Sequence, residues 1–159
     1  ILHFTTMYWI TGMAILGRTF LDGSTRVFAR SMEGEKTLQM IEKYKLTSLF
    51  VAPIYTYQLT NVPNPERYDL SSFRCLLTGG TPMSTDQYKK LTQLFPKAQV
   101  LFGYGMSEIG LLSIFHPEDD KHLIDTKVGS CGKVSPRTLL KVSTIVCLVA
   151  FCVLVFVDC

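Results

Sequence analysis

The sequence predicts an α/β fold, in which a mostly parallel sheet is flanked by helices. Three observations support this prediction. Short runs of strand-forming residues begin near positions 25, 47, 74 and 98. Segments with helical patterning separate these runs, and their lengths suit crossover connections between parallel strands. Glycines directly follow the last two runs, and glycine lets backbone approach a ligand closely.

The first part of the chain contains two helical segments. Residues 7–20 are apolar nearly all round and are followed by Asp22 and Gly23, which predicts a helix that is buried on most sides and stops there. Residues 25–29 are a short strand candidate. Residues 34–45 alternate apolar and charged side chains at helical spacing, which is typical of an amphipathic helix.

The next unit repeats strand and helix. Residues 47–52 are predicted to form a buried strand, and Pro53 suits the first turn of a helix that continues to about residue 62. Two prolines then place a loop at residues 63–65.

The third unit ends at the glycine-rich stretches. Residues 74–78 are predicted to form a strand. Ser84 with Gln87 three residues later is a capping box that opens a helix to about residue 95. Residues 98–102 form the next strand candidate. Because ligands bind at the carboxyl ends of strands in such sheets, both glycine stretches should lie at one edge and form a pocket.

The remaining segments are less regular. Residues 111–115 are predicted to be a strand, residues 116–126 an exposed charged loop, and residues 128–134 a turn. Residues 138–142 are a further strand candidate. Residues 145–157 are thirteen apolar residues without a break.

This apolar tail has more than one interpretation. Thirteen residues are too few to cross a bilayer, which needs about twenty, so a membrane anchor is not expected. A buried strand or hydrophobic end, and an altered terminus, remain compatible alternatives. The Val-rich run would favour aggregation if it were exposed.

The composition is that of a globular protein. The chain has 159 residues, 47% apolar and 18% charged, with a net charge of +3 and no basic stripe, so nucleic acid is not an expected partner. Five cysteines without C-x-x-C spacing favour a reducing, intracellular compartment and argue against a disulfide framework or a zinc site. The chain begins within an apolar segment, and we expect it to be a piece of a longer protein.

The most informative stretch is residues 100–110. An apolar run reaches two glycines, and Ser107 and Glu108 follow. A serine hydroxyl can donate to a phosphate oxygen, and a carboxylate is a ligand that suits Mg²⁺. The alternative is a strand, a glycine turn and a surface Ser-Glu pair without a ligand.

Four blocks, in order, resemble the adenylate-forming family of acyl-CoA synthetases, 4-coumarate-CoA ligases and firefly luciferase. They are residues 8–13 with the Gly23 region, residues 78–82, residues 103–108 and residues 128–134. The resemblance covers residues 1–142 and implies part of the large domain of such an enzyme, the AMP-binding or adenylation domain. Residues 143–159 form a tail unrelated to the family pattern.

The resemblance implies a two-step reaction with ATP, Mg²⁺ and coenzyme A. A carboxylic acid attacks the α-phosphate of ATP to give an acyl-adenylate, and the thiol of coenzyme A then displaces AMP. It implies a contact of Ser107 with the α-phosphate, binding of Mg²⁺ by Glu108 and stacking of Tyr104 on adenine. The nucleotide-binding residues that it implies are Gly79, Gly80, Thr81, Pro82, Gly103, Tyr104, Gly105 and Met106.

Two departures from the family pattern affect this expectation. Tyr8 and Trp9 stand where many members have histidine, and we interpret them as the wall of an acyl pocket, which favours a fatty-acyl substrate over an aromatic acid or luciferin. His3 does not align with that histidine and is expected in the core or at the end of an element. The family's lysine-containing phosphate loop and its C-terminal domain would lie outside residues 1–142.

Three hypotheses follow. The chain is the core of an ATP-dependent acyl-CoA ligase, or a non-catalytic remnant that binds nucleotide or acyl groups weakly, or an interaction protein whose function lies in its tail. The family resemblance implies a peroxisomal or cytoplasmic location, although residues 157–159 are not a peroxisomal signal. The sequence does not indicate an oligomeric state.

Overall fold

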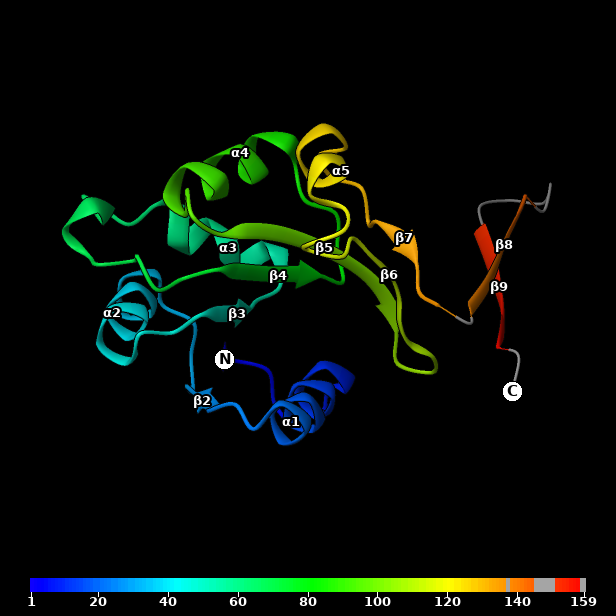
Figure 1. The fold of residues 1–159 in the computed structure, drawn as a ribbon, viewed down its shortest axis with the longest axis horizontal. Helices are drawn as coiled ribbons and strands as arrows, with labels where there is room; N and C mark the ends of the chain where they lie inside the picture. Colours follow the sequence, from blue (N-terminus) through cyan, green and yellow to red (C-terminus); the bar gives the residue numbers. More distant parts are fainter. Residues whose placement is uncertain (137, 145–150, 158–159) are drawn as a thin grey trace.

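A computed structural model describes residues 1–136, 138–144 and 151–157 (Figure 1). The elements are β1 (Leu2–His3), α1 (Ile10–Asp22), β2 (Val27–Phe28), α2 (Gly34–Tyr44), β3 (Ser48–Phe50), α3 (Pro53–Thr60), a 3-10 turn (Pro65–Arg67), β4 (Cys75–Gly79), α4 (Thr85–Leu94), β5 (Gln99–Met106), β6 (Gly110–Ile114), α5 (Lys121–Thr126), β7 (Lys133–Val134), β8 (Thr138–Thr144) and β9 (Phe151–Val157).

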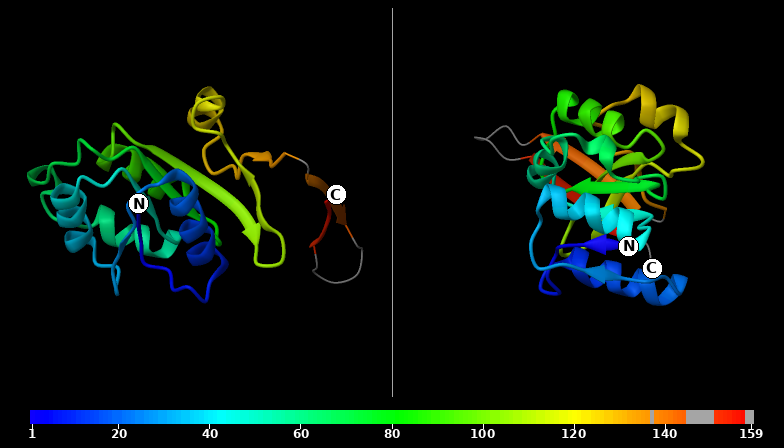
Figure 2. Two further views of the ribbon diagram at one scale, coloured as in Figure 1. Left: turned by 60° about the horizontal axis from the view of Figure 1, so that its bottom comes forward. Right: turned by 90° about the vertical axis from the view of Figure 1, so that its left-hand side faces the viewer.

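Within the described residues, one sheet of seven strands has the order β2-β1-β3-β4-β5-β6-β7. The pairs from β2 through β5 are parallel, whereas β6 and β7 are antiparallel. Parallel neighbours need crossover connections, and α2, α3 and α4 supply them along the body of the sheet (Figures 1 and 2). The predicted fold class, a mostly parallel sheet flanked by helices, is confirmed.

The main core lies between the parallel strands and these helices. Leu38 of α2, Leu59 of α3 and Leu91 of α4 are fully buried against Leu49 and Leu76 of the central strands. Because side chains alternate along a strand, Leu101 points to the other side of β5 from Val100 and packs in a second, smaller cluster. The parallel sheet therefore has its largest buried surface on the α2, α3 and α4 side.

Helix α1 forms as predicted and ends at Gly23, whose backbone is left-handed (φ 62°) and donates to the Thr19 carbonyl. The prediction that it is buried on most sides is wrong for this chain. Phe20 and Leu21 are 79% and 87% exposed, and the buried residues of the helix are Gly12 and Thr19. An apolar helix is buried only where other elements cover it, and the described residues cover one side.

One of the two hydrogen bonds expected of the predicted capping box is formed. The Ser84 hydroxyl accepts a hydrogen bond from the Gln87 backbone N–H at 3.2 Å. The Gln87 side chain does not return to Ser84; its amide instead donates to Thr56 Oγ1 at 3.0 Å, across the buried contact between α3 and α4. Tertiary packing thus redirects a side chain that local pattern assigns to the cap.

Strand β1 was not predicted, because two residues are too few to show a period. It lies between β2 and β3. His3 is fully buried there, as expected of a core histidine: its Nε2 accepts from Arg26, and its Nδ1 lies 3.1 Å from Thr5 Oγ1. Burial and the neighbouring Arg26 charge lower the pKa of His3. The imidazole is therefore held neutral, with its proton on Nδ1 toward Thr5.

The tail contains a strand. Strand β9 pairs antiparallel with β8, from Thr138 opposite Val157 to Thr144 opposite Phe151, and this pair lies apart from the seven-stranded sheet (Figure 1). Residues 145–150 of the apolar run lie outside the described residues. No helix in the described part of the chain has the length and apolar character to cross a membrane.

Candidate functional site

The two glycine stretches meet at one edge of the sheet. In the parallel pair β4–β5, Thr78 lies opposite Phe102 and Gly79 lies opposite Gly103. Both strands point their carboxyl ends the same way, so residues 80–82 leave the sheet next to the centre of β5. The two stretches therefore meet at Thr78–Gly79 and Phe102–Gly103, as expected, whereas the pocket expected between them stays a prediction.

The second stretch, however, is not a loop at this point. Strand β5 continues through Gly103, Tyr104 and Gly105 to Met106, and pairs with β6 after a register shift between Tyr104 and Gly105. The turn follows at residues 107–109. The prediction that the strand ends at residue 102 is wrong, because antiparallel pairing with β6 extends it.

This extension separates the predicted site residues. Ser107 lies four residues beyond Gly103, which corresponds to about 13 Å along an extended strand. The structure therefore brings residues 78–80 and 102–103 together and places Ser107 and Glu108 at the tip of the β5–β6 hairpin, which projects away from the sheet (Figure 1). Gly79, Gly80 and Gly103 therefore lie at the edge of the sheet, whereas Ser107 and Glu108 lie beyond it.

The glycines near this edge are needed for different structural reasons. A Cβ on Gly79 would lie 2.3 Å from the Gly103 carbonyl oxygen, and a Cβ on Gly105 would lie 2.4 Å from the Gly110 carbonyl oxygen. Protein backbone, rather than a ligand, thus fills the space beside these two glycines. Gly80 is different: its φ is +96° and nothing lies within 4 Å of a Cβ built on it, so its backbone faces open space.

Polar groups at the edge are available for a ligand. Thr78 is fully buried, and among the described residues its Oγ1 is the buried side-chain oxygen without a hydrogen-bond partner. Ser107 and Glu108 are exposed and take part in none of the side-chain hydrogen bonds or ion pairs formed by the described residues. Thr81 and Pro82 are also exposed. A polar molecule bound here could pair with the exposed side chains of Thr81, Ser107 and Glu108, whereas the Thr78 hydroxyl is enclosed by protein atoms.

Binding of Mg²⁺ by Glu108 stays a prediction. No group of three or more His, Cys, Asp or Glu side chains within the described residues is arranged to hold a metal. Glu108 would therefore supply one oxygen ligand. This fits Mg²⁺, which commonly keeps several waters and is bound by one or two carboxylates together with substrate phosphates.

Tyr8 and Trp9 lie at the start of α1, where Trp9 is the N-cap residue. Their rings meet edge to face, with centroids 6.5 Å apart, and are 94% and 61% exposed. Within the described residues they do not line an enclosed space. Their assignment to an acyl pocket stays a prediction.

Sequence reasoning missed a buried carboxylate. Residues 116–126 were predicted to be an exposed loop, but they contain α5, and Asp120 is 3% exposed. Its carboxylate accepts the His116 N–H at 3.0 Å and forms an ion pair with Lys133 of β7. Hydrogen bonds from Lys133 and His116 lower the pKa of Asp120. Asp119, its neighbour in the same acidic run, is exposed. No pattern in the sequence shows which of the two aspartates is buried.

The cysteines of the described core are free thiols. Cys75 lies in β4 and Cys131 in the turn before β7, and neither forms a disulfide. Burial raises the pKa of Cys75 to about 11, which leaves the thiol protonated and unreactive at neutral pH. Cys75 therefore acts as an apolar side chain at the end of β4 opposite the glycine edge.

Comparisons with known proteins agree on one family. Residues 1–144 match the family described as "AMP-binding enzyme". Acyl-CoA synthetase 7 of Caenorhabditis elegans is 31% identical over 141 residues, which are 89% of this chain and 25% of that protein. 4-coumarate-CoA ligase 1 of Narcissus pseudonarcissus is 35% identical over 121 residues, 76% of this chain and 22% of that protein.

A solved structure is also similar. It is the luciferase-like enzyme from the nonluminescent mealworm Zophobas morio, which is 99% identical, with a TM-score of 0.87 over 89% of this chain and 33% of that one. The chain thus spans about a quarter of the length of the curated relatives and a third of this structure.

Proposed function

The chain belongs to the AMP-binding enzyme family, and on this basis we propose that it carries the nucleotide-binding edge of an ATP-dependent acid-thiol ligase. The observation that carries the proposal is the register that sets Gly79 beside Gly103, with Ser107 and Glu108 in the turn that follows the second of these strands. The exposed Gly80 backbone at the edge, with a hydroxyl and a carboxylate on the hairpin beyond it, supports binding of a nucleoside phosphate.

The proposed reaction has two balanced steps. An oxygen of the acid's carboxylate attacks the α-phosphorus of ATP, the bond to the β-phosphate bridging oxygen breaks, and acyl-adenylate and pyrophosphate form. The sulfur of coenzyme A then attacks the acyl carbon, AMP leaves, and the thiol proton is released. Magnesium, when bound, would neutralise charge on the phosphate oxygens.

This chain's residues would contribute binding and orientation. The Tyr104 ring, 36% exposed on β5, is available to stack on adenine beside the Gly79–Gly80 backbone. Ser107 would donate to an α-phosphate oxygen, and Glu108 would hold the metal from the hairpin tip. Fixed donors at the developing phosphate charge are the main way in which proteins accelerate such transfers.

The acyl group is proposed to be a fatty acid. The support is the pair of large apolar rings at Tyr8 and Trp9, in place of a family histidine, together with a largely apolar α1 behind them. A peroxisomal or cytoplasmic location rests on the family resemblance and stays a prediction.

A second candidate function is binding without turnover. It is favoured by the exposed apolar side chains of α1, such as Phe20 and Leu21, and by the share of the relatives' length that the chain spans. In that case the chain would bind AMP weakly and form no acyl-CoA.

The decisive experiment compares two proteins, the 159-residue chain and the same chain extended at both ends to the relatives' length. Each is incubated with ATP, Mg²⁺, coenzyme A and a series of fatty acids, and pyrophosphate release is measured. We expect release from the extended protein and none from the 159-residue chain. No release from the extended protein with any acid would contradict the ligase proposal, and acyl-CoA formed by the short chain would contradict binding alone.

Site residues are tested by titration of AMP with Mg²⁺. Tyr104→Ala and Glu108→Gln should each weaken binding, and the Glu108 variant should lose the dependence on Mg²⁺ while the Tyr104 variant keeps it. Glu118→Gln, an exposed acid in another segment, serves as the matched control and should bind as the natural chain does. Unchanged affinity in both site variants would show that the nucleotide does not use the hairpin.

A further inference from the structure

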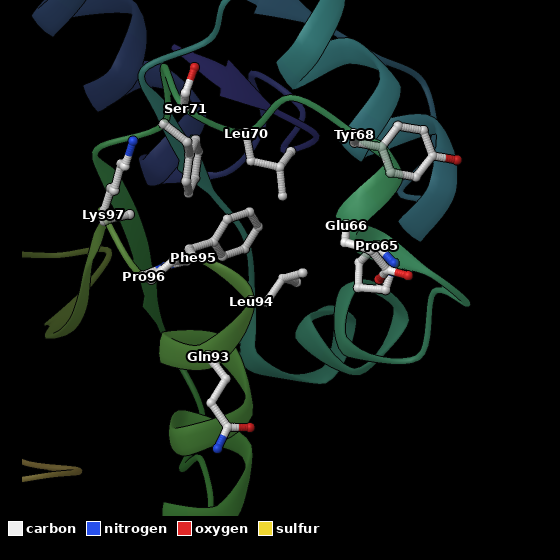
Figure 3. A pocket seen from close by; sticks show the side chains of 12 residues that line it. Pro65, Glu66, Tyr68, Leu70, Ser71, Gln93, Leu94, Phe95, Pro96 and Lys97 are labelled. Atoms are coloured by element: carbon white, nitrogen blue, oxygen red, sulfur yellow. The ribbon is translucent and has the colours of Figure 1, made fainter.

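A cavity of about 440 Å³ lies at the end of the sheet opposite the glycine edge, between residues 65–73 and residues 93–98 (Figure 3). Phe73 and Phe95 beside it are 1% and 2% exposed, and their rings pack on each other with centroids 4.5 Å apart. These rings belong to the core and offer a ligand no surface. The chain itself therefore already covers the aromatic surface at this end of the sheet.

The pair formed by β8 and β9 is covered less completely. Leu139 and Leu140 of β8 are 58% and 37% exposed. Because neighbouring residues of a strand point to opposite faces, both faces of the pair are open to solvent at this point. The pair also lies apart from the seven-stranded sheet (Figure 1). An isolated pair of strands is marginally stable in water, whereas three or more strands can be stable, so additional strands would stabilise this pair.

Each strand of the pair has one edge without a partner strand among the described residues. Such an edge presents unpaired N–H and C=O groups that can pair with another extended strand. The edges of the seven-stranded sheet are β2 and β7, each two residues long. They are too short to match the seven residues of β8 or of β9, so none of the described strands of this chain can fill these edges.

The two edges differ in charge at their centres. The fourth residue of β8 is Lys141, and it lies opposite Leu154, the fourth residue of β9. If two copies paired β8 with β8 in antiparallel fashion about the middle, the two lysines would lie opposite each other, which is unfavourable. The same pairing of β9 sets Leu154 opposite Leu154. Strand β9 contains no charged residue, proline or glycine, which is typical of segments that pair with identical segments. The free edge of β9 therefore fits the same strand of a second copy.

We propose that β9 is a self-association strand: the β9 strands of two copies pair in antiparallel fashion and form a four-stranded sheet of order β8-β9-β9-β8. A two-fold axis at Leu154 relates the copies, so Phe151 of each copy lies opposite Val157 of the other. Lys141 at the centre of each outer edge disfavours the addition of further copies. The assembly therefore closes as a dimer.

The first test measures the mass of the 159-residue chain by sedimentation equilibrium over a range of concentrations. We expect a dimer that dissociates on dilution. Leu154→Lys places two like charges opposite each other and should raise the dissociation constant roughly tenfold or more. Leu139→Lys makes the same change at an exposed position of the outer strand β8, and as the matched control it should leave the dissociation constant unchanged.

Because Leu154→Lys also places a charge within the hairpin itself, disulfide formation tests the register separately. The background is a chain in which serine replaces the tail cysteines, Cys147, Cys152 and Cys159. In it, Leu154→Cys should form a disulfide-linked dimer on oxidation, because the two thiols stand on directly opposite residues. Val157→Cys should not, because residue 157 lies opposite Phe151 of the second copy and the two thiols are about 20 Å apart along the strands.

Three results would overturn the proposal. The first is a natural chain that stays monomeric at the highest concentration measured, or that forms open-ended fibres. The second is a dimer that persists in Leu154→Lys; if Phe20→Lys abolished that dimer, the interface would lie on the exposed face of α1. The third is disulfide formation that is as efficient in Val157→Cys as in Leu154→Cys.

Discussion

Replacement of Gly79 by alanine tests whether the glycine edge is built by strand packing. The added Cβ would lie 2.3 Å from the Gly103 carbonyl oxygen, 0.7 Å short of the 3.0 Å below which Cβ contacts are essentially never found. Both groups are main chain within the paired strands β4 and β5, so neither can rotate away. Overpacking of this kind costs about 1–3 kcal/mol, and a backbone clash belongs at the upper end of that range.

Gly17→Ala provides a control of identical chemistry and opposite expected sign. Gly17 is exposed within α1, and nothing lies within 4 Å of a Cβ built there. Alanine in a helix interior is favoured over glycine by roughly 0.5–1 kcal/mol. The two variants should therefore differ by about 3.5–4 kcal/mol in the free energy of unfolding.

The assay is urea unfolding followed by far-ultraviolet circular dichroism. The dependence of the free energy of unfolding on urea concentration should be the same for the natural chain and both variants. We expect the midpoint to fall for Gly79→Ala and to rise slightly for Gly17→Ala. A Gly79→Ala protein as stable as the natural chain would refute the packing argument, because it would mean that β4 and β5 can separate at this point without cost.

The remaining predictions concern side-chain contacts, each measured by the same unfolding assay. Ser84→Ala should lose about 1 kcal/mol, because it removes the N-cap of α4. Gln87→Ala should lose about 1–3 kcal/mol, because it removes a buried amide and its bond to Thr56. Asp120→Asn should destabilise the protein by breaking the ion pair with Lys133. The variant should also make the free energy of unfolding less dependent on pH in the acid range. The pKa of Asp120 is lowered in the folded protein, so its carboxylate stabilises the fold fully above the pKa of the unfolded chain, about 3.9. This stabilisation is lost as the pH falls through the lower pKa of the folded protein.

Matched controls separate these contacts from general effects. Thr85→Ala, Gln93→Ala and Asp119→Asn remove exposed groups next to, or on the same helix as, the three targets. Each control should stay within about 0.5 kcal/mol of the natural chain. Equal losses in a target and its control, or an acid profile unchanged by Asp120→Asn, would show that the named contact is not the cause.

Local pattern accounts for most of the elements. The positions of α2, α3 and α4 follow from side-chain period, Pro53 and the Ser84 cap, and the end of α1 follows from Gly23. The convergence of residues 78–82 with residues 102–103 also follows from the sequence, because consecutive parallel strands end at the same edge. These features depend on residues near one another in the chain, or on a rule that holds for every sheet of this class.

Other features depend on contacts that the sequence does not encode locally. Strand β5 continues through two glycines because β6 pairs with it, and this moves Ser107 and Glu108 to the hairpin tip. The Gln87 side chain leaves its cap because buried hydroxyls of α3 offer better partners.

The sequence by itself determined the family blocks, the order of strands and helices from α1 to β6, and the edge at which the glycines meet. Only the tertiary structure decided that Asp120 rather than Asp119 is buried, that α1 exposes its apolar side chains, and that a cavity lies opposite the glycine edge. The reason is physical: periodicity reports which faces of an element are apolar, whereas burial and ion pairing depend on which distant residues cover them.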